Sequence, residues 1–171
     1  RSMNPWRGRP FSWEPSTESL VSSKASVFSS KDPHSAMMTW VEISSSALLH
    51  NYDLFRVLDP SIIVIPVIKS NAYGHGMAMV ATLLERHRHP AMFAVVNAGE
   101  ALELRNQGIK TPLLILSAFQ DLNDRQIREC LRQDMVFPLY DPLDASRLST
   151  LATHRWPARV HLKVAIGTSR L

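Results

Sequence analysis

The chain has few of the features that would place it in several large protein classes. Its 171 residues contain one cysteine, Cys130, so an internal disulfide is excluded and a reducing compartment, the cytoplasm, is expected. No apolar run approaches the length of a membrane span. The net charge is only +4 and the basic residues are scattered, so no nucleic-acid partner is expected. The remaining composition is that of an ordinary globular domain.

Residues 1–38 lack the aliphatic periodicity of the rest of the chain. Serine, proline and tryptophan are plentiful there, so we expect a disordered leader. A secretory signal would need an apolar central run, whereas a serine-rich, acid-poor stretch is compatible with a transit peptide. The alternative that we favour is a misassigned start, with Met37 or Met38 as the natural first residue.

From residue 39 onward, apolar runs typical of strands alternate with segments of helical periodicity. After an opening strand over 39–43, we expect a helix capped within Ser44–Ser46. The expected strands are 62–64, 91–96, 113–116, 135–139 and 160–164. Five helices are expected, and each carries apolar residues on one face. In chain order these residues are Leu48, Tyr52, Phe55 and Leu58; Met77, Val80, Ala81 and Leu84; Ala101, Leu102 and Leu104; Ile127, Cys130 and Leu131; and Leu143, Leu148 and Leu151.

The alternation predicts an α/β fold with about five parallel strands joined by helices. Asn97 is expected to begin one of these helices and Gly108 to follow its end, whereas the helix before 135–139 is expected to run from 121 to 132. The pattern alone leaves an open sheet and a closed barrel as alternatives. The sequence contains no G-x-G-x-x-G fingerprint that would favour a dinucleotide fold.

Lys69 follows the first of these strands and precedes Tyr73, Gly74, His75 and Gly76. A lysine at a strand end is most simply a solvated cation. If its stem starts inside the sheet, however, a partly desolvated amine becomes a nucleophile towards aldehydes. The loop adds a tyrosine hydroxyl and, at the glycines, backbone N–H groups that could hold a phosphate before the helix that begins at Met77. Such a pair of groups is what pyridoxal phosphate requires.

Residues 68–76, Ile-Lys-Ser-Asn-Ala-Tyr-Gly-His-Gly, closely resemble the cofactor-lysine motif of the alanine racemase family. The resemblance extends over 39–51, 93–116 and 161–171. It implies a (β/α)8 barrel of the TIM type, of which about five strands are present here, preceded by one strand that would belong to a missing β domain. In an incomplete barrel the strand 160–164 is an uncovered edge, so the isolated chain is expected to aggregate or to need a partner.

The resemblance also implies a function, the interconversion of L- and D-alanine by a pyridoxal 5′-phosphate enzyme that supplies D-alanine for a cell wall. Lys69 would bind the cofactor and act as a base, Tyr73 would contact the cofactor, and Arg170 would bind near the substrate carboxylate. Lys163, a carbamate in many members, would orient Arg170, and His75 would assist catalysis or fix the loop. Members of the family are expected to be homodimers.

Two features depart from the family pattern. Ala165 and Ile166 stand where members usually carry Asp-Thr, which affects the placement of Arg170. The second base, a tyrosine from the downstream domain of the other subunit, is expected to be absent from this chain. A fragment of the racemase is therefore the first hypothesis, and a non-catalytic cofactor-binding barrel or an inactive truncated product is the alternative. His87 and His89 could suggest a metal site, but a solvated helix end is expected there.

Overall fold

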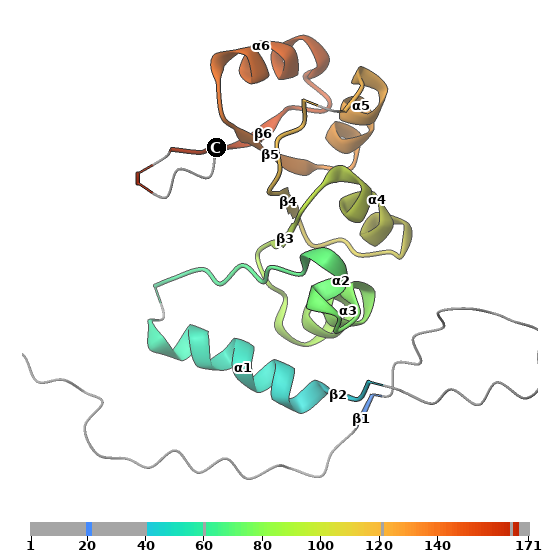
Figure 1. The fold of residues 1–171 in the computed structure, drawn as a ribbon, viewed down its shortest axis with the longest axis vertical. Helices are drawn as coiled ribbons and strands as arrows, with labels where there is room; N and C mark the ends of the chain where they lie inside the picture. The colour runs from blue at the N-terminus through green and yellow to red at the C-terminus, as the bar shows by residue number, and fades with distance from the viewer. Residues whose placement is uncertain (1–19, 22–40, 60, 121, 165, 168–171) are drawn as a thin grey trace, which may run out of the picture.

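The computed structural model describes residues 20–21, 41–59, 61–120, 122–164 and 166–167. Its centre is a parallel sheet of four strands in the order β3, β4, β5, β6, with one helix between each consecutive pair (Figure 1). In chain order these elements are β3 (Phe93–Val95), α4 (Ala98–Asn106), β4 (Leu113–Ile115), α5 (Asp124–Arg132), β5 (Met135–Leu139), α6 (Pro142–Leu151) and β6 (Arg159–Leu162). The predicted parallel α/β architecture is therefore confirmed.

A fifth strand would lie beside β3, but the described chain forms only one β-bridge there. Val67 pairs in parallel with Ala94, which donates its N–H to the Pro66 carbonyl and accepts from the Ile68 N–H, both at 2.9 Å. The expected strand over 62–64 is wrong, because pairing occurs only at Val67. Ile62 and Ile63 have no paired neighbour in the described part of the chain and are 48% and 72% exposed. Proline also lacks the N–H that a longer ladder would need.

The main core lies between the sheet and its helices. Alternate strand residues such as Phe93, Leu113 and Phe137 point to this side and are fully buried. The Phe137 ring packs edge-on against Phe119, with the centroids 5.2 Å apart. The opposite side of the sheet carries a smaller apolar cluster built on Ala94, Leu114 and Val136. Both faces of the central strands are thus apolar, as in a sheet that curves around an inner core.

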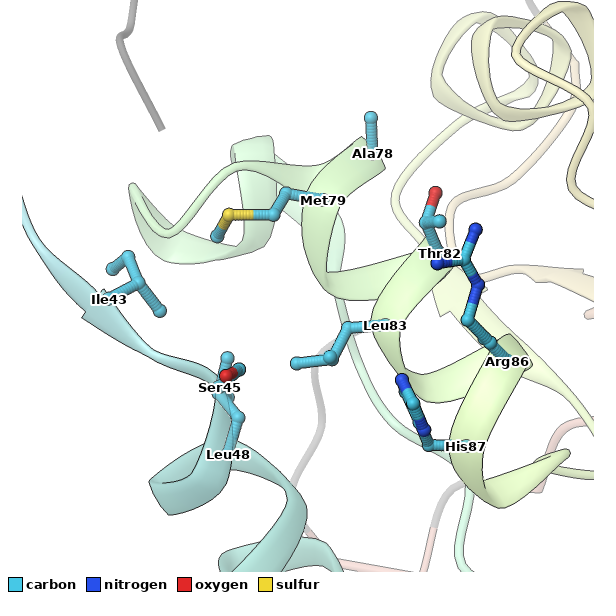
Figure 2. Close-up of a pocket in the computed structure, with 9 residues that line it drawn as sticks. All are labelled: Ile43, Ser45, Leu48, Ala78, Met79, Thr82, Leu83, Arg86 and His87. Carbon is cyan, nitrogen blue, oxygen red and sulfur yellow. The ribbon is translucent and has the colours of Figure 1, made fainter. Parts of the chain in front are cut away.

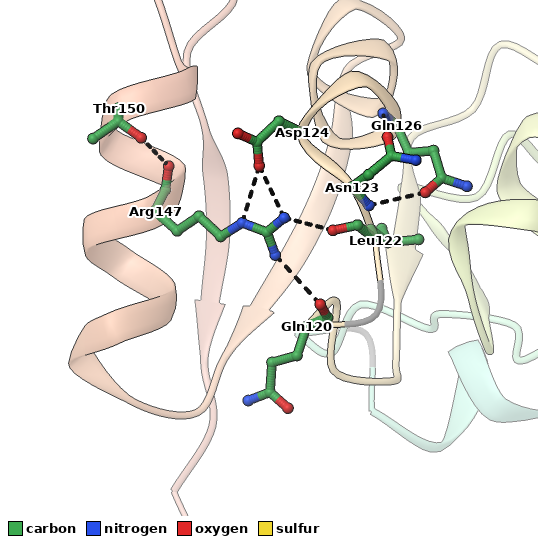
Figure 3. A network of polar contacts seen from close by, with 7 residues as sticks. All are labelled: Gln120, Leu122, Asn123, Asp124, Gln126, Arg147 and Thr150. Carbon is green, nitrogen blue, oxygen red and sulfur yellow. Dashed lines mark hydrogen bonds and ion pairs between the residues drawn. The ribbon is translucent and has the colours of Figure 1, made fainter.

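Helix boundaries follow local capping groups. Asn97 accepts the Glu100 N–H at 3.0 Å and begins α4, and Gly108 follows the end of that helix with φ +90°, as both residues predict. The helix α5 begins at Asp124 rather than at residue 121, because Asn123 and Gln126 form a reciprocal capping box. Arg147 of α6 binds Asp124 at 2.9 Å and the carbonyls of Gln120 and Leu122, which fixes α6 against the start of α5 (Figure 3).

Besides the short α2 (Lys69–Tyr73), two longer helices precede β3. The helix α3 (Met77–Arg88) buries all four predicted positions, Met77, Val80, Ala81 and Leu84. The helix α1 (Ser45–Leu58) is capped by Ser44 as expected and joined to α3 by a two-pronged contact from Arg88 to Asp53 at 2.7 Å.

The apolar stripes predicted for α1 and α6 are only partly buried. In α1, Tyr52 is buried, but Phe55 and Leu58 are more than half exposed, since the later half of that helix extends beyond α3 (Figure 1). In α6, Leu148 and Leu151 are buried, but Leu143 is 79% exposed. Leu143 follows the first residue of α6, where the side chain lies outside the helix–sheet contact.

Of the opening strand expected over 39–43, the structure describes 41–43 and only Ile43 is in a strand, whereas residues 39 and 40 lie outside the described residues. β2 (Ile43–Ser44) pairs antiparallel with β1 (Leu20–Val21), which is the only described part of the segment 1–38. The expectation of a disordered leader for the rest of that segment lies outside the described residues. Among the helices that the structure describes, none combines the length and apolar character of a membrane span.

Candidate functional site

Lys69 lies at the carboxyl end of the first strand position. It follows Ile68, which is 2% exposed, and it is itself half-buried. The peptide on each side of Lys69 is hydrogen-bonded, since the Ile68 carbonyl accepts from the Ala72 N–H at 2.8 Å and the Ser70 N–H donates to Glu100 at 2.7 Å. The carboxyl ends of parallel strands share one edge of a sheet, and that edge is where α/β barrels carry their functional side chains.

The turn that follows Lys69, α2 (Lys69–Tyr73), is left-handed. Ser70, Asn71, Ala72 and Tyr73 have φ values between +53° and +55°, although none is a glycine. A left-handed conformation costs an ordinary residue about 1–2 kcal/mol, so four in succession must be held by surrounding contacts. Strained backbone of this kind is concentrated at functional sites. The sequence predicted a glycine-containing loop here and gave no sign of the handedness.

Asn71 organises the end of this turn. Its carbonyl accepts from the N–H groups of Gly74 and Gly76, and its side-chain oxygen accepts from the Met77 N–H at 2.9 Å. The expectation that Gly74 and Gly76 offer free N–H groups to a phosphate is therefore wrong. Those donors are used to join the left-handed turn to the start of α3.

Tyr73 and His75 lie on the same loop as Lys69. The Lys69 Nζ is 6.0 Å from the centre of the Tyr73 ring, and Tyr73 is 63% exposed. The His75 Nδ1 lies 2.9 Å from the Ala72 carbonyl oxygen and can donate to it, which leaves Nε2 outward. This geometry supports the loop-fixing role that was one of the two alternatives for His75.

A second group of polar side chains lies at the carboxyl ends of the later strands. The Tyr140 hydroxyl donates to the Leu116 carbonyl at 2.6 Å, and the Lys163 Nζ lies 5.0 Å from the Tyr140 ring centre. Burial, with a smaller effect of the Asp144 carboxylate, raises the pKa of Tyr140, so the phenol stays protonated and can keep donating. Sequence reasoning missed Tyr140, whose position just after β5 was the available signal.

Of the predicted site residues, the structure brings together Lys69, Tyr73 and His75, and it places Lys163 directly after β6. Val160 and Leu162 of β6 are 41% and 76% exposed, because no helix of the described chain covers them. Arg170 and Ala165 lie outside the described residues.

Glu100 was missed as a functional candidate. It stands three residues after the helix cap Asn97, a spacing at which a glutamate normally caps its own helix. In the structure its carboxylate instead accepts from the Ser70 N–H at 2.7 Å and from the Val96 N–H at 2.8 Å. The capping pattern could have drawn attention to Glu100, but its contact with the Lys69 turn depends on tertiary structure.

A cavity of about 480 Å³ lies between α1 and the segment that leads to Lys69, and Tyr73 and His75 contribute to its mostly apolar lining. A second cavity of about 410 Å³ lies between α1 and α3 (Figure 2). It is lined mainly by apolar side chains, with Arg86 and His87 near one end. No group of three metal-ligating side chains is present in the part of the chain that the structure describes, and Arg88, between the two histidines, binds Asp53.

Comparison with known proteins identifies relatives for most of the chain. Residues 43–171 match the family model described as alanine racemase, N-terminal domain. The chain is 35% identical over 135 residues to alanine racemase 1 of Caldanaerobacter subterraneus subsp. tengcongensis, covering 78% of this chain and 34% of that protein. It is 36% identical over 130 residues to the alanine racemase of Haemophilus influenzae, covering 76% and 35% of the two chains.

Solved structures give the same result for the fold. The crystal structure of alanine racemase from E. faecalis aligns with a TM-score of 0.67 and 27% identity, covering 75% of this chain and 34% of that one. The predicted partial (β/α)8 barrel is thereby confirmed. The chain spans about a third of the length of the curated relatives it matches.

Proposed function

Because the chain belongs to the alanine racemase N-terminal domain family, we propose that Lys69 and Tyr73 bind pyridoxal 5′-phosphate in an enzyme that interconverts L- and D-alanine. The observation that carries the proposal is the Lys69 turn. A half-buried amine lies at the carboxyl edge of the parallel sheet, both flanking peptides are anchored, and a tyrosine ring lies 6.0 Å away. A lysine that was only a solvated surface cation would not need to be followed by four residues with left-handed backbone.

The donor set of the turn fits the cofactor in two respects. A primary amine is the group that holds a pyridoxal aldehyde, and an exposed phenolic hydroxyl can donate to a phosphate oxygen. The glycine N–H groups do not add to this set, because they bind Asn71. When bound, the cofactor would supply an electron sink that makes the α-proton of the amino acid acidic.

Each site residue then has a defined task. The Lys69 Nζ would hold the cofactor and would take or return the α-proton of alanine on one face. The Tyr73 hydroxyl would hold a phosphate oxygen. His75 would keep the loop in shape through its contact with Ala72. The guanidinium of Arg170, supported by Lys163, would bind near the carboxylate of the substrate.

The proposal includes the setting of the family. We infer a cytoplasmic homodimer that acts on free alanine, and a product, D-alanine, that serves cell-wall synthesis. No nucleic-acid or membrane partner is part of this function. The second base that inversion requires would come from the partner subunit, because one base returns the proton to the side from which it was taken.

A cofactor-binding protein without racemase activity is the second candidate. It requires only the Lys69 turn, which the described residues contain, and no base on the opposite face. Tyr52 is a buried residue of α1, Tyr73 lies on the Lys69 loop, and the Tyr140 hydroxyl is bound to the Leu116 carbonyl. None is positioned as a base opposite Lys69 in the described structure. Formation of D-alanine from L-alanine by the purified chain would exclude this candidate.

Borohydride reduction after incubation with pyridoxal 5′-phosphate tests the binding site. We expect the label at Lys69 by peptide mass spectrometry, and a loss of that label in Lys69→Ala with no loss in Lys110→Ala, which removes an exposed lysine of a loop. Tyr73→Phe should keep the label at Lys69 but require more cofactor, whereas it should bind plain pyridoxal as the wild type does. Labelling spread evenly over the lysines would refute the proposal.

A further inference from the structure

Glu100 connects the Lys69 turn, thirty residues before it in the sequence, to the end of β3. One oxygen of its carboxylate accepts the Ser70 N–H at 2.7 Å and the other accepts the Val96 N–H at 2.8 Å. Ser70 directly follows Lys69, and Val96 directly follows β3. The carboxylate therefore joins the carboxyl ends of two neighbouring strands at the edge where the proposed site lies.

The Ser70 N–H belongs to the peptide that follows Lys69. The peptide before Lys69 is held by the bond from the Ala72 N–H to the Ile68 carbonyl, which is internal to the turn. The contact with Glu100 is thus the bond that fixes this turn to the rest of the sheet on the side of the lysine. Bonds to an ionised acceptor are about twice as strong as neutral ones, so this contact can offset part of the left-handed strain.

The position of Glu100 on its helix fixes the direction of its carboxylate. Glu100 is in the first turn of α4, where the helix dipole stabilises a negative charge. Its own N–H is held by Asn97, and its neighbour Ala101 is fully buried, so the backbone of this turn of the helix is fixed. Because the helix backbone that carries Glu100 is fixed, its carboxylate can determine the direction of a neighbouring backbone segment.

We propose that Glu100 is a positioning residue that sets the direction in which Lys69 presents its amine to the cofactor. This inference rests on the proposed function, in which Lys69 is the cofactor lysine. Glu100 acts through the Ser70 N–H and the left-handed turn, and it touches neither substrate nor cofactor. Without it, the turn would relax towards a right-handed conformation and the amine would leave the site.

The first measurement concerns the protein without cofactor. In Glu100→Gln, the side-chain amide places an NH2 donor against one of the two N–H groups, so at least one bond is lost. We expect hydrogen exchange at Ser70 to accelerate roughly ten-fold, the factor that a lost bond of about 1.4 kcal/mol gives. Glu103→Gln, an exposed residue of the same helix, is the matched control and should leave the Ser70 exchange rate unchanged.

The second measurement is selective labelling. Under limiting pyridoxal 5′-phosphate and borohydride, the ratio of label at Lys69 to label at Lys110 should fall roughly ten-fold in Glu100→Gln and stay constant in Glu103→Gln. Because both lysines are in one molecule, the ratio is insensitive to the amount of protein recovered. Glu100→Asp serves if Glu100→Gln does not fold, since it keeps the charge but is one methylene too short to reach both donors, and the same fall is expected.

The outcomes separate the inference from the proposed function. Selective labelling of Lys69 in the wild type with an unchanged ratio in both Glu100 variants would overturn the role of Glu100 and leave the proposed function intact. Absence of selective labelling in the wild type would overturn both. Faster Ser70 exchange together with a lower Lys69 ratio, under conditions in which far-ultraviolet circular dichroism shows Glu100→Gln and Glu103→Gln to be equally folded, would support a positioning role over a general structural one.

Discussion

The centre and the two margins of the sheet are stabilised in different ways. The strands β3, β4 and β5 are buried by apolar packing on the helix side, where Phe93, Leu113 and Phe137 are fully enclosed. At the margin before β3, the turn that begins at Lys69 is held by the hydrogen bonds of Glu100 and Asn71. At the opposite margin, all four residues of β6 are exposed, and it is joined to β5 mainly by the strand ladder. Apolar packing therefore stabilises the centre of the sheet, whereas the candidate site lies at a margin where polar contacts replace this packing.

Removal of a central aromatic side chain should have the largest effect. Phe137→Ala leaves a cavity beside Phe119, and large-to-small changes of this kind cost about 3–5 kcal/mol. Val160→Ala on β6 should cost less than about 1 kcal/mol, because Val160 is 41% exposed. Urea unfolding followed by far-ultraviolet circular dichroism measures both. Equal losses would show that the centre and the β6 margin do not differ in packing.

Glu85 of α3 makes a polar contact in the well-packed part of the molecule. Its carboxylate accepts from the N–H groups of Lys110 and Thr111 and from the Thr111 hydroxyl, which ties α3 to the segment before β4. Burial alone would raise the pKa of Glu85, but these hydrogen bonds and the charge of Arg105 together lower it below the ordinary value near 4.5. We expect Glu85→Gln to cost about 1–3 kcal/mol at neutral pH.

The pH dependence of this loss has a definite sign. A carboxylate whose folded pKa is depressed contributes stability above its unfolded pKa, and that contribution disappears as the pH falls through the folded pKa. The difference in unfolding free energy between the wild type and Glu85→Gln should therefore be greatest near pH 7 and shrink below about pH 4.5. Glu103→Gln is the control, and a difference that grows with acidity would contradict this account.

Substitution of Asn71 tests how the margin of the sheet at Lys69 is stabilised. Asn71→Ala removes the acceptor of the Met77 N–H and places a residue less tolerant of positive φ in the left-handed turn. We expect a loss of about 1 kcal/mol in unfolding free energy and a larger relative loss of pyridoxal phosphate label at Lys69. Asn106→Ala, at the exposed end of α4, is the control for the substitution itself. Unchanged labelling would show that the turn does not need Asn71.

The elements that sequence reasoning predicted well are those whose signal is local. Met77, Val80, Ala81 and Leu84 repeat at helical spacing, and all four are buried in α3. Asn97 and Gly108 carry their capping preferences in their own side chains or in the lack of one. The family resemblance of residues 68–76 was equally readable, because it is carried by a continuous run of nine residues. These parts of the fold and of the candidate site required no knowledge of tertiary contacts.

The features that sequence reasoning missed depend on distant partners. Nothing in Ser-Asn-Ala-Tyr specifies a left-handed turn, which is held in part by Glu100, thirty residues later. The strand expected over 62–64 failed because β propensity does not create pairing where the described chain supplies no neighbour. Phe55 and Leu143 satisfied a helical stripe, yet their helices extend past the surface that would bury them. Local patterns therefore predicted which elements form, and tertiary contacts determined how their ends are shaped.

The smallest effect on the unfolding free energy is expected for an exposed ion pair at the β6 margin of the sheet. Arg159 at the start of β6 pairs with Asp134 at 3.2 Å, and both side chains are more than half exposed. Exposed ion pairs contribute about 0–1 kcal/mol, so Arg159→Gln should change the unfolding free energy by less than Asn71→Ala does. The measurement should be made at low and at high salt, because screening would remove even this contribution. A loss that rivals that of Glu85→Gln and survives high salt would mean that β6 is held by its charges as firmly as the centre is held by its polar contacts.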